Sequence, residues 1–160
     1  FKVKHMMFTN VSGKFETYEA DITTEDDDFT KSAIAFSADI ASINTNNADR
    51  DNHLKSADFF DAENHPKLTF VSTSFTKIDE ENYELIGELS LHGMTKTVKL
   101  PAEFSGLMKD PWGNTKAGLN ISGKINRKDW GLNWNSALET GGVLVSDEVR
   151  LNIELQLLKQ

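Results

Sequence analysis

The chain has 160 residues and is 38% hydrophobic, which favours a single domain over residues 1–160 with one core. Its formal net charge of −8 argues against a nucleic-acid partner, because phosphates need a protein face rich in Lys and Arg. The absence of cysteine excludes disulfide scaffolds, zinc–thiolate sites, iron–sulfur clusters and cysteine nucleophiles.

The first segments predict strands. The chain begins with Phe1 inside "FKVKH", which already resembles the middle of a strand, so we expect the N-terminal strand to be incomplete. "GKFETYEADI" follows a turn at "NVSG", and the acidic run at residues 24–28 is most simply a solvated turn. In "SAIAFSADI" every second residue is apolar or small, which is typical of a strand with one buried face. These residues are Ile34, Phe36, Ala38 and Ile40.

The segment "RDNHLKSADFFDAENHP", residues 50–66, breaks this alternation. It predicts a short helix whose apolar side is formed by Ala48, Leu54, Ala57 and Phe60. Asn47 is suited to cap the N-terminus of this helix, and Pro66 marks the exit into the next strand. We therefore expect a helical connection between two strands, with Phe59 or Phe60 packed against one end of the fold.

Five later segments return to a period of two, and turns such as "LHGMT" and "DPWGN" separate some of them. About eight long amphipathic strands with short turns predict an all-β fold, an antiparallel up-and-down barrel. A two-sheet sandwich is the alternative that periodicity leaves open. The five segments are "KLTFVSTSFTKI", "YELIGELSL", "KTVKLPAEF", "AGLNISGKI" and "EVRLNIELQLL".

Metal and catalytic sites find little support in the sequence. No two of the four His residues are separated by one, three or four residues, the spacings that bring ligands together on one strand or helix. His53 and His65 could still meet in space. There is no G-x-S-x-G elbow and no glycine-rich phosphate loop, and Asp58 and Asp61 most simply lie on a solvated helix face. We expect no metal, no cofactor and no catalysis.

The interior allows two interpretations. A barrel of about eight strands either fills with side chains or holds one slender ligand. Large inward candidates alternate with small ones, namely Ala38, Gly87, Ala117 and Gly123. The small residues can leave a channel or can relieve crowding where a barrel tapers, and the pattern favours neither.

Several motifs occur together along the chain. "SADIASINTNNADRDNHLKSADFFDAENHPKLTF" contains S-I-x-T, then R-D-x-H-L-K-S, then D-F-F-D and a proline before the next strand. "GELSLHGMTKTVKL" contains H-G-x-T-K-x-V, and "FSGLMKDPWGNTKAGLNISGKINRKDWGLNWN" and "GGVLVSDEVRLNIELQL" complete the C-terminal half. Over essentially all 160 residues the chain resembles the YceI-like family of bacterial polyisoprenoid-binding, lipocalin-like proteins. Members usually carry a further short strand segment ahead of "FKVKH".

The resemblance implies a lipocalin-like barrel around an elongated apolar tunnel, with a short helix between two strands. It implies binding, transport or storage of a long-chain isoprenoid or similar amphiphilic lipid, and no chemistry. The alternative is a lipid-modifying hydrolase or isomerase that uses His and Asp residues near residues 50–65. A filled barrel that serves only in protein interaction is a third hypothesis.

The expected partner is an isoprenoid or fatty-acid-like lipid, not nucleic acid, and a homodimer is left open. The resemblance implies the bacterial periplasm, while the cytoplasm stays open because no signal peptide is visible. Arg50 either pairs with a neighbouring Asp to shape its loop or holds a phosphate head group, for which Lys55, Lys67, Arg127 and Lys128 are further bases. The expected ligand-binding residues are Phe36, Ala38, Phe59, Phe60, Phe70, Leu89, Leu91, Val98, Phe104, Ile121, Arg50 and His53.

Overall fold

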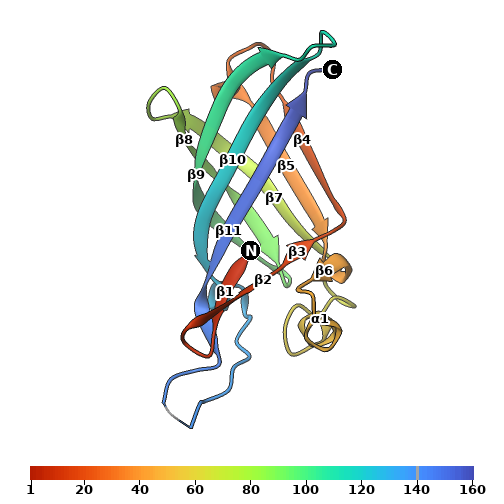
Figure 1. Ribbon diagram of the computed structural model, residues 1–160, viewed down its shortest axis with the longest axis vertical. Coiled ribbons are helices and arrows are strands. Elements are labelled where there is room, and N and C mark those ends of the chain that lie inside the picture. The colour runs from red at the N-terminus through yellow and green to blue at the C-terminus, as the bar shows by residue number, and fades with distance from the viewer. Residues whose placement is uncertain (140) are drawn as a thin grey trace.

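Most of the chain is antiparallel strand, as the period of two predicts. The computed structural model describes residues 1–139 and 141–160 (Figure 1). Its main sheet contains β1 (Lys2–His5), β2 (Thr9–Ser12), β4 (Tyr18–Thr23), β5 (Ala33–Asp39), β7 (Lys67–Lys77), β8 (Asn82–Leu91), β9 (Met94–Lys109), β10 (Thr115–Asn126) and β11 (Val145–Leu158). A separate pair joins β3 (Lys14–Phe15) to β6 (Ile43–Asn44), so "GKFETYEADI" forms two strands instead of one.

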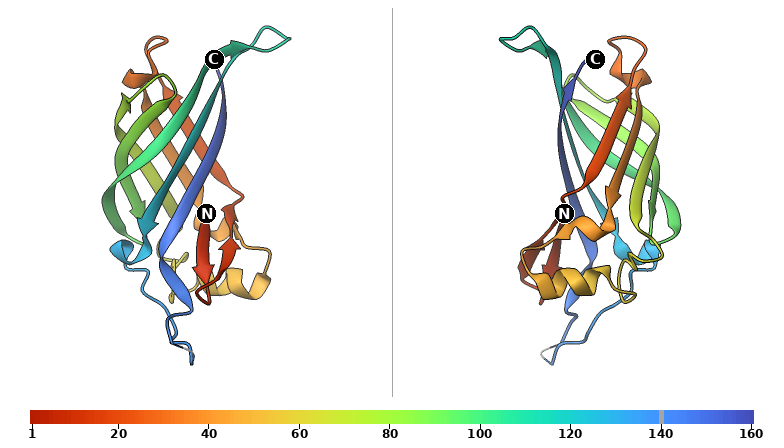
Figure 2. Two further views of the ribbon diagram at one scale, coloured as in Figure 1. Left: turned by 60° about the vertical axis from the view of Figure 1, so that its left-hand side comes forward. Right: turned by 90° about the vertical axis from the view of Figure 1, so that its right-hand side faces the viewer.

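The main sheet curls into a half-barrel that remains open. Its strand order is β2-β1-β11-β10-β9-β8-β7-β5-β4, so β2 and β4 are its edges. Figures 1 and 2 show β4 and the second half of β11 on the two sides of the opening. The antiparallel, barrel-like, all-β class is therefore confirmed, and the sheet has nine strands among the described residues.

Short helices occupy the connections. The expected helix is α1 (Ala48–Lys55), and the Asn47 side chain caps it by accepting a hydrogen bond from the Arg50 backbone N–H at 2.9 Å. Three 3-10 turns are η1 (Phe29–Lys31), η2 (Ile40–Ser42) and η3 (Arg127–Trp130). Within the described part of the chain, no helix has both the length and the apolar character needed to cross a membrane.

The connections gather at two ends of the half-barrel (Figures 1 and 2). The helix end carries the β1–β2 turn, α1, η3 and the connecting residues 56–66, 92–93, 131–139 and 141–144. The turn end carries the shorter connections at residues 24–32, 78–81 and 110–114. The long strands β7 to β11 thus run between the two ends, whereas β1 and β2 are short and lie at the helix end.

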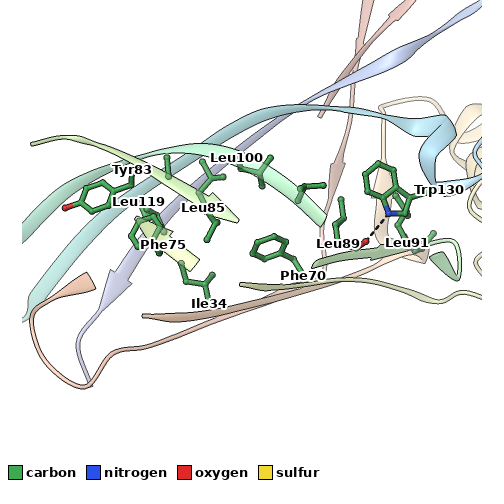
Figure 3. Close-up of a cluster of buried hydrophobic side chains, with 14 of the residues drawn as sticks. Ile34, Phe70, Phe75, Tyr83, Leu85, Leu89, Leu91, Leu100, Leu119 and Trp130 are labelled. Atoms are coloured by element: carbon green, nitrogen blue, oxygen red, sulfur yellow. Dashed lines mark hydrogen bonds between the residues drawn. The ribbon is translucent and has the colours of Figure 1, made fainter. Parts of the chain in front are cut away.

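The core lies on the concave face of the sheet and is continuous from one end to the other (Figure 3). At the helix end it finishes at Trp130, whose indole Nε1 donates a hydrogen bond to the Leu89 backbone oxygen at 2.9 Å. Gly131 follows directly with a left-handed φ of 73° and ends η3, and Leu132 after it is buried in the same core. The buried members of this core include Ile34, Phe70, Phe75, Tyr83, Leu85, Leu89, Leu91, Leu100 and Leu119.

Trp130→Phe should lower the free energy of unfolding by about 2 kcal/mol, because it leaves the Leu89 carbonyl without its indole donor and shrinks a buried side chain. Urea unfolding followed by circular dichroism measures this. Trp112→Phe is the matched control, because Trp112 is 82% exposed, and it should change stability by less than about 0.5 kcal/mol. Equal effects of the two substitutions would contradict this role of Trp130.

Candidate functional site

The side chains expected to face a ligand inside the barrel lie on the concave face of the sheet. Phe36 and Phe104 are partly buried against the core, and Ala38 is fully buried on β5. Five others are buried members of the core, namely Phe70, Leu89, Leu91, Val98 and Ile121. Contact of these residues with a ligand stays a prediction.

Burial of the concave face changes across the sheet. Inner side chains such as Leu85 and Leu119 are fully buried, whereas those beside the opening are only partly buried. Ile153 lies opposite the buried Ile121, and Leu155 lies opposite Leu119, so the apolar residues of β11 face inward. We call the partly buried set the apolar seam; its members are Ile22, Phe36, Leu151, Ile153 and Leu155.

Backbone hydrogen bonds do not seal the apolar seam among the described residues. β1 pairs with β11 only up to Arg150, and β4 is a sheet edge. Tyr18 at the start of β4 is exposed and stacks on Phe36 with ring centroids 5.8 Å apart. Near the turn end, Lys159 Nζ meets Asp27 Oδ1 at 3.1 Å, an exposed ion pair that holds the two sides together weakly.

Aromatic rings fill the turn end. Phe29 of η1 packs on Phe104 with centroids 4.3 Å apart, and Tyr83 contacts both Phe104 and Phe75. Beside them, Ser32 is 9% exposed and follows the same alternation as the inward-facing Ile34. Its Oγ is buried and has no hydrogen-bond partner among the described residues. A buried hydroxyl in this state is costly unless a ligand or water bonds to it.

The rim of the turn end is acidic. The pKa of Asp26 is lowered by the backbone N–H of Asp28 and by Lys31, and the pKa of Asp28 is lowered by hydrogen bonds from Thr30. In the β9–β10 turn, the Asn114 side chain chiefly lowers the pKa of Asp110 to about 2. These carboxylates stay ionised well below neutral pH, so the rim disfavours an anionic head group.

At the helix end, Arg50 bonds to a threonine and not to a neighbouring aspartate, which was one of the two alternatives for this residue. Its guanidinium donates to Thr45 Oγ1 at 2.8 Å and to the Thr45 backbone oxygen at 2.9 Å. Asp51 accepts from the Thr45 backbone N–H at 2.9 Å and from its hydroxyl. Arg50 and Asp51 therefore both hold the buried Thr45 at the entry to α1, which favours the structural interpretation of Arg50.

His53 bonds locally, as its position on the helix predicts. Its Nε2 lies 2.9 Å from Asp58 Oδ2, and the two side chains are 38% and 59% exposed. The imidazole also meets Phe59 and Trp134 edge-on, with centroids 5.2 and 4.7 Å apart. Phe59 therefore packs with His53 and Trp134. Phe60 instead contacts Phe15.

His65 does not meet His53 and instead lies against His92, with ring centroids 5.3 Å apart. His92 Nδ1 is 2.9 Å from the Trp130 backbone oxygen, which holds the ring at the β8–β9 turn. Among residues 1–139 and 141–160, no three or more His, Asp or Glu side chains are arranged to hold a metal ion.

Arg127 was expected as an exposed base for a head group, and this was wrong. It is 4% exposed, and its guanidinium donates to the backbone oxygens of four residues, Leu132, Trp134, Val145 and Ser146. Burial lowers the pKa of Arg127, and the Asp147 carboxylate, 3.9 Å away, opposes that shift. Arg127 thus organises the β10–β11 connection, because four of its five N–H donors bond to backbone oxygens.

Sequence reasoning omitted the β11 residues of the apolar seam and Ser32. The alternation in "EVRLNIELQLL" did place Leu151, Ile153 and Leu155 on one face. It did not show that this face borders the opening, because strand order is a property of the whole sheet. No sequence signal distinguishes Ser32 from other serines.

A family model described as YceI-like domain matches residues 1–157. A UPF0312 protein of Staphylococcus epidermidis is 40% identical over 151 residues, which cover 94% of this chain and 85% of the relative. The crystal structure of a Campylobacter jejuni YceI protein is similar with a TM-score of 0.85 and 36% identity, covering 100% of this chain and 91% of that one. A polyisoprenoid binding domain from Saccharophagus degradans shares the fold at a TM-score of 0.72 and 13% identity, over 97% of this chain and 89% of that one.

Arg50→Met should lower the free energy of unfolding by about 1–3 kcal/mol, because Thr45 loses two charge-assisted hydrogen bonds. Any loss of lipid binding should be equal for a charged and an uncharged lipid of the same chain length. Thermal unfolding and parallel titrations measure the two effects, with Asn52→Ala on the exposed side of α1 as the control. A selective loss of the charged lipid would instead make Arg50 a head-group ligand.

Proposed function

The chain belongs to the YceI-like family, and we propose that it binds the long apolar chain of an isoprenoid or a similar amphiphilic lipid along the apolar seam. One observation carries this proposal. The concave face is buried on β8 to β10 but only partly buried at Ile22, Phe36 and the middle of β11. Large inward side chains that stay partly exposed to water do not stabilise the fold. An apolar ligand that covers them removes this surface from water, which is favourable.

The length of the apolar seam suits an elongated ligand. Residues 151–158 of β11 extend beyond the pairing with β1, and eight residues of strand span about 26 Å. At about 0.3 kcal/mol per heavy atom, four isoprene units contribute about 6 kcal/mol, which corresponds to a dissociation constant of tens of micromolar. Longer chains bind more tightly without any charged contact.

A neutral head group fits the turn end better than a phosphate does. Ser32 supplies a buried hydroxyl without a partner, and the surrounding rim carries Asp26, Asp28 and Asp110. An alcohol or carbonyl oxygen bonds to Ser32 without opposing those charges, whereas a phosphate meets repulsion. We therefore propose an uncharged polar head at this end in place of the head-group site first considered at Arg50.

Catalysis is not part of this proposal. The His53–Asp58 pair is the acid–base pair that a hydrolase or isomerase would need, but both side chains are substantially exposed at the helix end. The His53–Asp58 pair faces solvent and therefore does not contact a lipid bound on the concave face. Transport or storage of the ligand is the role that we propose, and a periplasmic location stays a prediction, which fractionation of the host tests.

The name of the Saccharophagus degradans domain agrees with the proposed ligand class, although at 13% identity its likeness supports the fold alone. The direct experiment is native mass spectrometry of the protein purified from its own host, followed by organic extraction and identification of the ligand. An isoprenoid or similar lipid at one copy per chain supports the proposal. Protein that carries no lipid and takes none up from isoprenoid alcohols contradicts it.

Ile153→Gln should weaken binding of a fluorescent isoprenoid alcohol by about tenfold, because a polar amide replaces apolar surface on the concave face. Glu154→Gln is the control on the outer face of the same strand and should leave binding unchanged. Fluorescence titration below the melting temperature of both variants measures the difference. Equal binding by the two variants would place the ligand elsewhere.

Ser32→Ala should weaken binding of an isoprenoid alcohol by about fivefold, the effect of one hydrogen bond, and should leave binding of the matching hydrocarbon unchanged. The ligand-free variant should be as stable as the parent or slightly more stable, because a buried unpaired hydroxyl is removed. Competition titrations and thermal unfolding measure both. Equal losses for alcohol and hydrocarbon would show that Ser32 contacts no head group.

A further inference from the structure

The β1–β2 turn exposes three consecutive large apolar side chains at the helix end. Met6, Met7 and Phe8 are 44%, 55% and 77% exposed, and Val143 of the facing loop is 40% exposed. The two loops are in contact. The Met6 backbone N–H donates to the Leu144 oxygen at 2.8 Å, and a Cβ on Gly142 would come within 3.0 Å of Met7 Sδ. These four side chains therefore form one surface, the apolar tip.

The backbone of the apolar tip is unfavourable for its residues. Met6 and Met7 have φ values of 53° and 70°, in the left-handed region that Gly, Asn or Asp occupies at much lower cost. A turn that only reversed the chain would be more stable with those residues. Large apolar side chains at this position thus cost stability as well as solubility, which points to a role outside the folded chain.

Bases lie on the strands next to the apolar tip although the whole chain carries a net charge of −8. Register places Lys2 opposite Arg150, and Arg150 opposite Lys124, in one row across β1, β11 and β10. Segments 2–8, 124–128 and 143–150 together hold six Lys or Arg residues and two acids. The bases still outnumber the acids when Asp129 and Glu139 of the flanking segments are included. We call the exposed ones the basic rim: Lys2, Lys4, Lys124, Lys128 and Arg150.

A surface hollow joins the two features. It has a volume of about 260 Å³ and is lined by Lys4, Met7, Lys128, Val143, Ser146 and Asp147. Apolar side chains of the tip and amino groups of the rim thus face the same space. Asp147 already pairs with Lys128 at 3.1 Å, whereas Lys4 has no ion-pair partner among the described residues.

We infer that the apolar tip and the basic rim dock the protein onto the surface of an anionic lipid bilayer. Met6, Met7 and Phe8 enter the boundary between head groups and acyl chains, and Lys4 and Lys128 meet lipid phosphates. Apolar insertion combined with a few bases is the pairing that holds peripheral proteins at anionic membranes. The inference does not depend on a ligand in the apolar seam.

A second copy of the chain fits this face less well. In a symmetric dimer the same patch lies on both partners, so the basic rim of one copy meets the basic rim of the other. Like charges across an interface oppose association. An anionic bilayer instead complements the rim, and a bilayer can take up the apolar tip without a matching pocket.

Vesicle flotation with the full chain tests the inference. The protein should bind vesicles of phosphatidylcholine mixed with phosphatidylglycerol, should not bind phosphatidylcholine alone, and should be released by salt. Lys4→Ser with Lys128→Ser should weaken binding by about 30-fold, about fivefold for each base. Met6→Asn, Met7→Gly and Phe8→Ser together should abolish flotation while the melting temperature stays equal or rises, because these residues suit the turn.

Trp112→Ser is the matched control at the opposite end, where an equally exposed apolar side chain lies beside the acidic rim, and it should bind vesicles as the parent does. Three results would each overturn the inference. These are failure of the parent to float with anionic vesicles, flotation of the tip and rim variants equal to that of the parent, and conversion of a dimer to a monomer by the tip variant without any vesicle binding by the parent. The last result would identify the tip as a surface for self-association.

Discussion

The feature on which the rest of this structure depends is the way the curled sheet ends. Nine antiparallel strands curl so that β4 and the second half of β11 border one opening, but the hydrogen-bonded order runs from β2 to β4 and does not join these two strands. A closed barrel hides its whole inner face, whereas here the inner side chains beside the opening stay partly exposed. The difference between a filled core on β8 to β10 and the apolar seam follows from this missing row of hydrogen bonds.

An unpaired sheet edge is also a hazard, because it offers backbone groups to other chains. In this protein β4 is short, with six residues, and carries Glu19 and Asp21 along its length. The exposed Lys159–Asp27 ion pair joins the two sides near the turn end, where it is weak enough to separate at little cost. The charged side chains of β4 therefore oppose pairing with other chains at the opening where we propose that the apolar ligand binds.

The two ends of the half-barrel differ in charge and in the hydrogen bonds that hold them. At the helix end, Arg127 donates to four backbone oxygens of the β10–β11 connection, and the indole of Trp130 bonds to Leu89 at the end of the core. The basic rim and the apolar tip lie at this same end. At the turn end, hydrogen-bonded carboxylates surround Phe29 and the unpartnered Ser32. A protein that presents its basic side to a membrane therefore turns the acidic rim, and with it the proposed head-group site, away from the lipid phosphates.

The sequence by itself determined the long strands, the short helix and the alternation of their side chains, but not the division of "GKFETYEADI" into β3 and β4. A period of two places Ile153 and Ile121 on the inward face whatever the neighbouring strands are. Asn47 caps α1 through a hydrogen bond from the backbone N–H of Arg50, only three positions further along the chain. Tertiary structure alone decided which strands border the opening. It also decided which Lys and Arg side chains are bonded within the fold and which face solvent. Arg127 is buried by residues up to 19 positions away, and Trp130 bonds to an oxygen 41 positions away. Such contacts depend on how the sheet curls, and a local pattern of residues carries no information about partners that are distant in the chain.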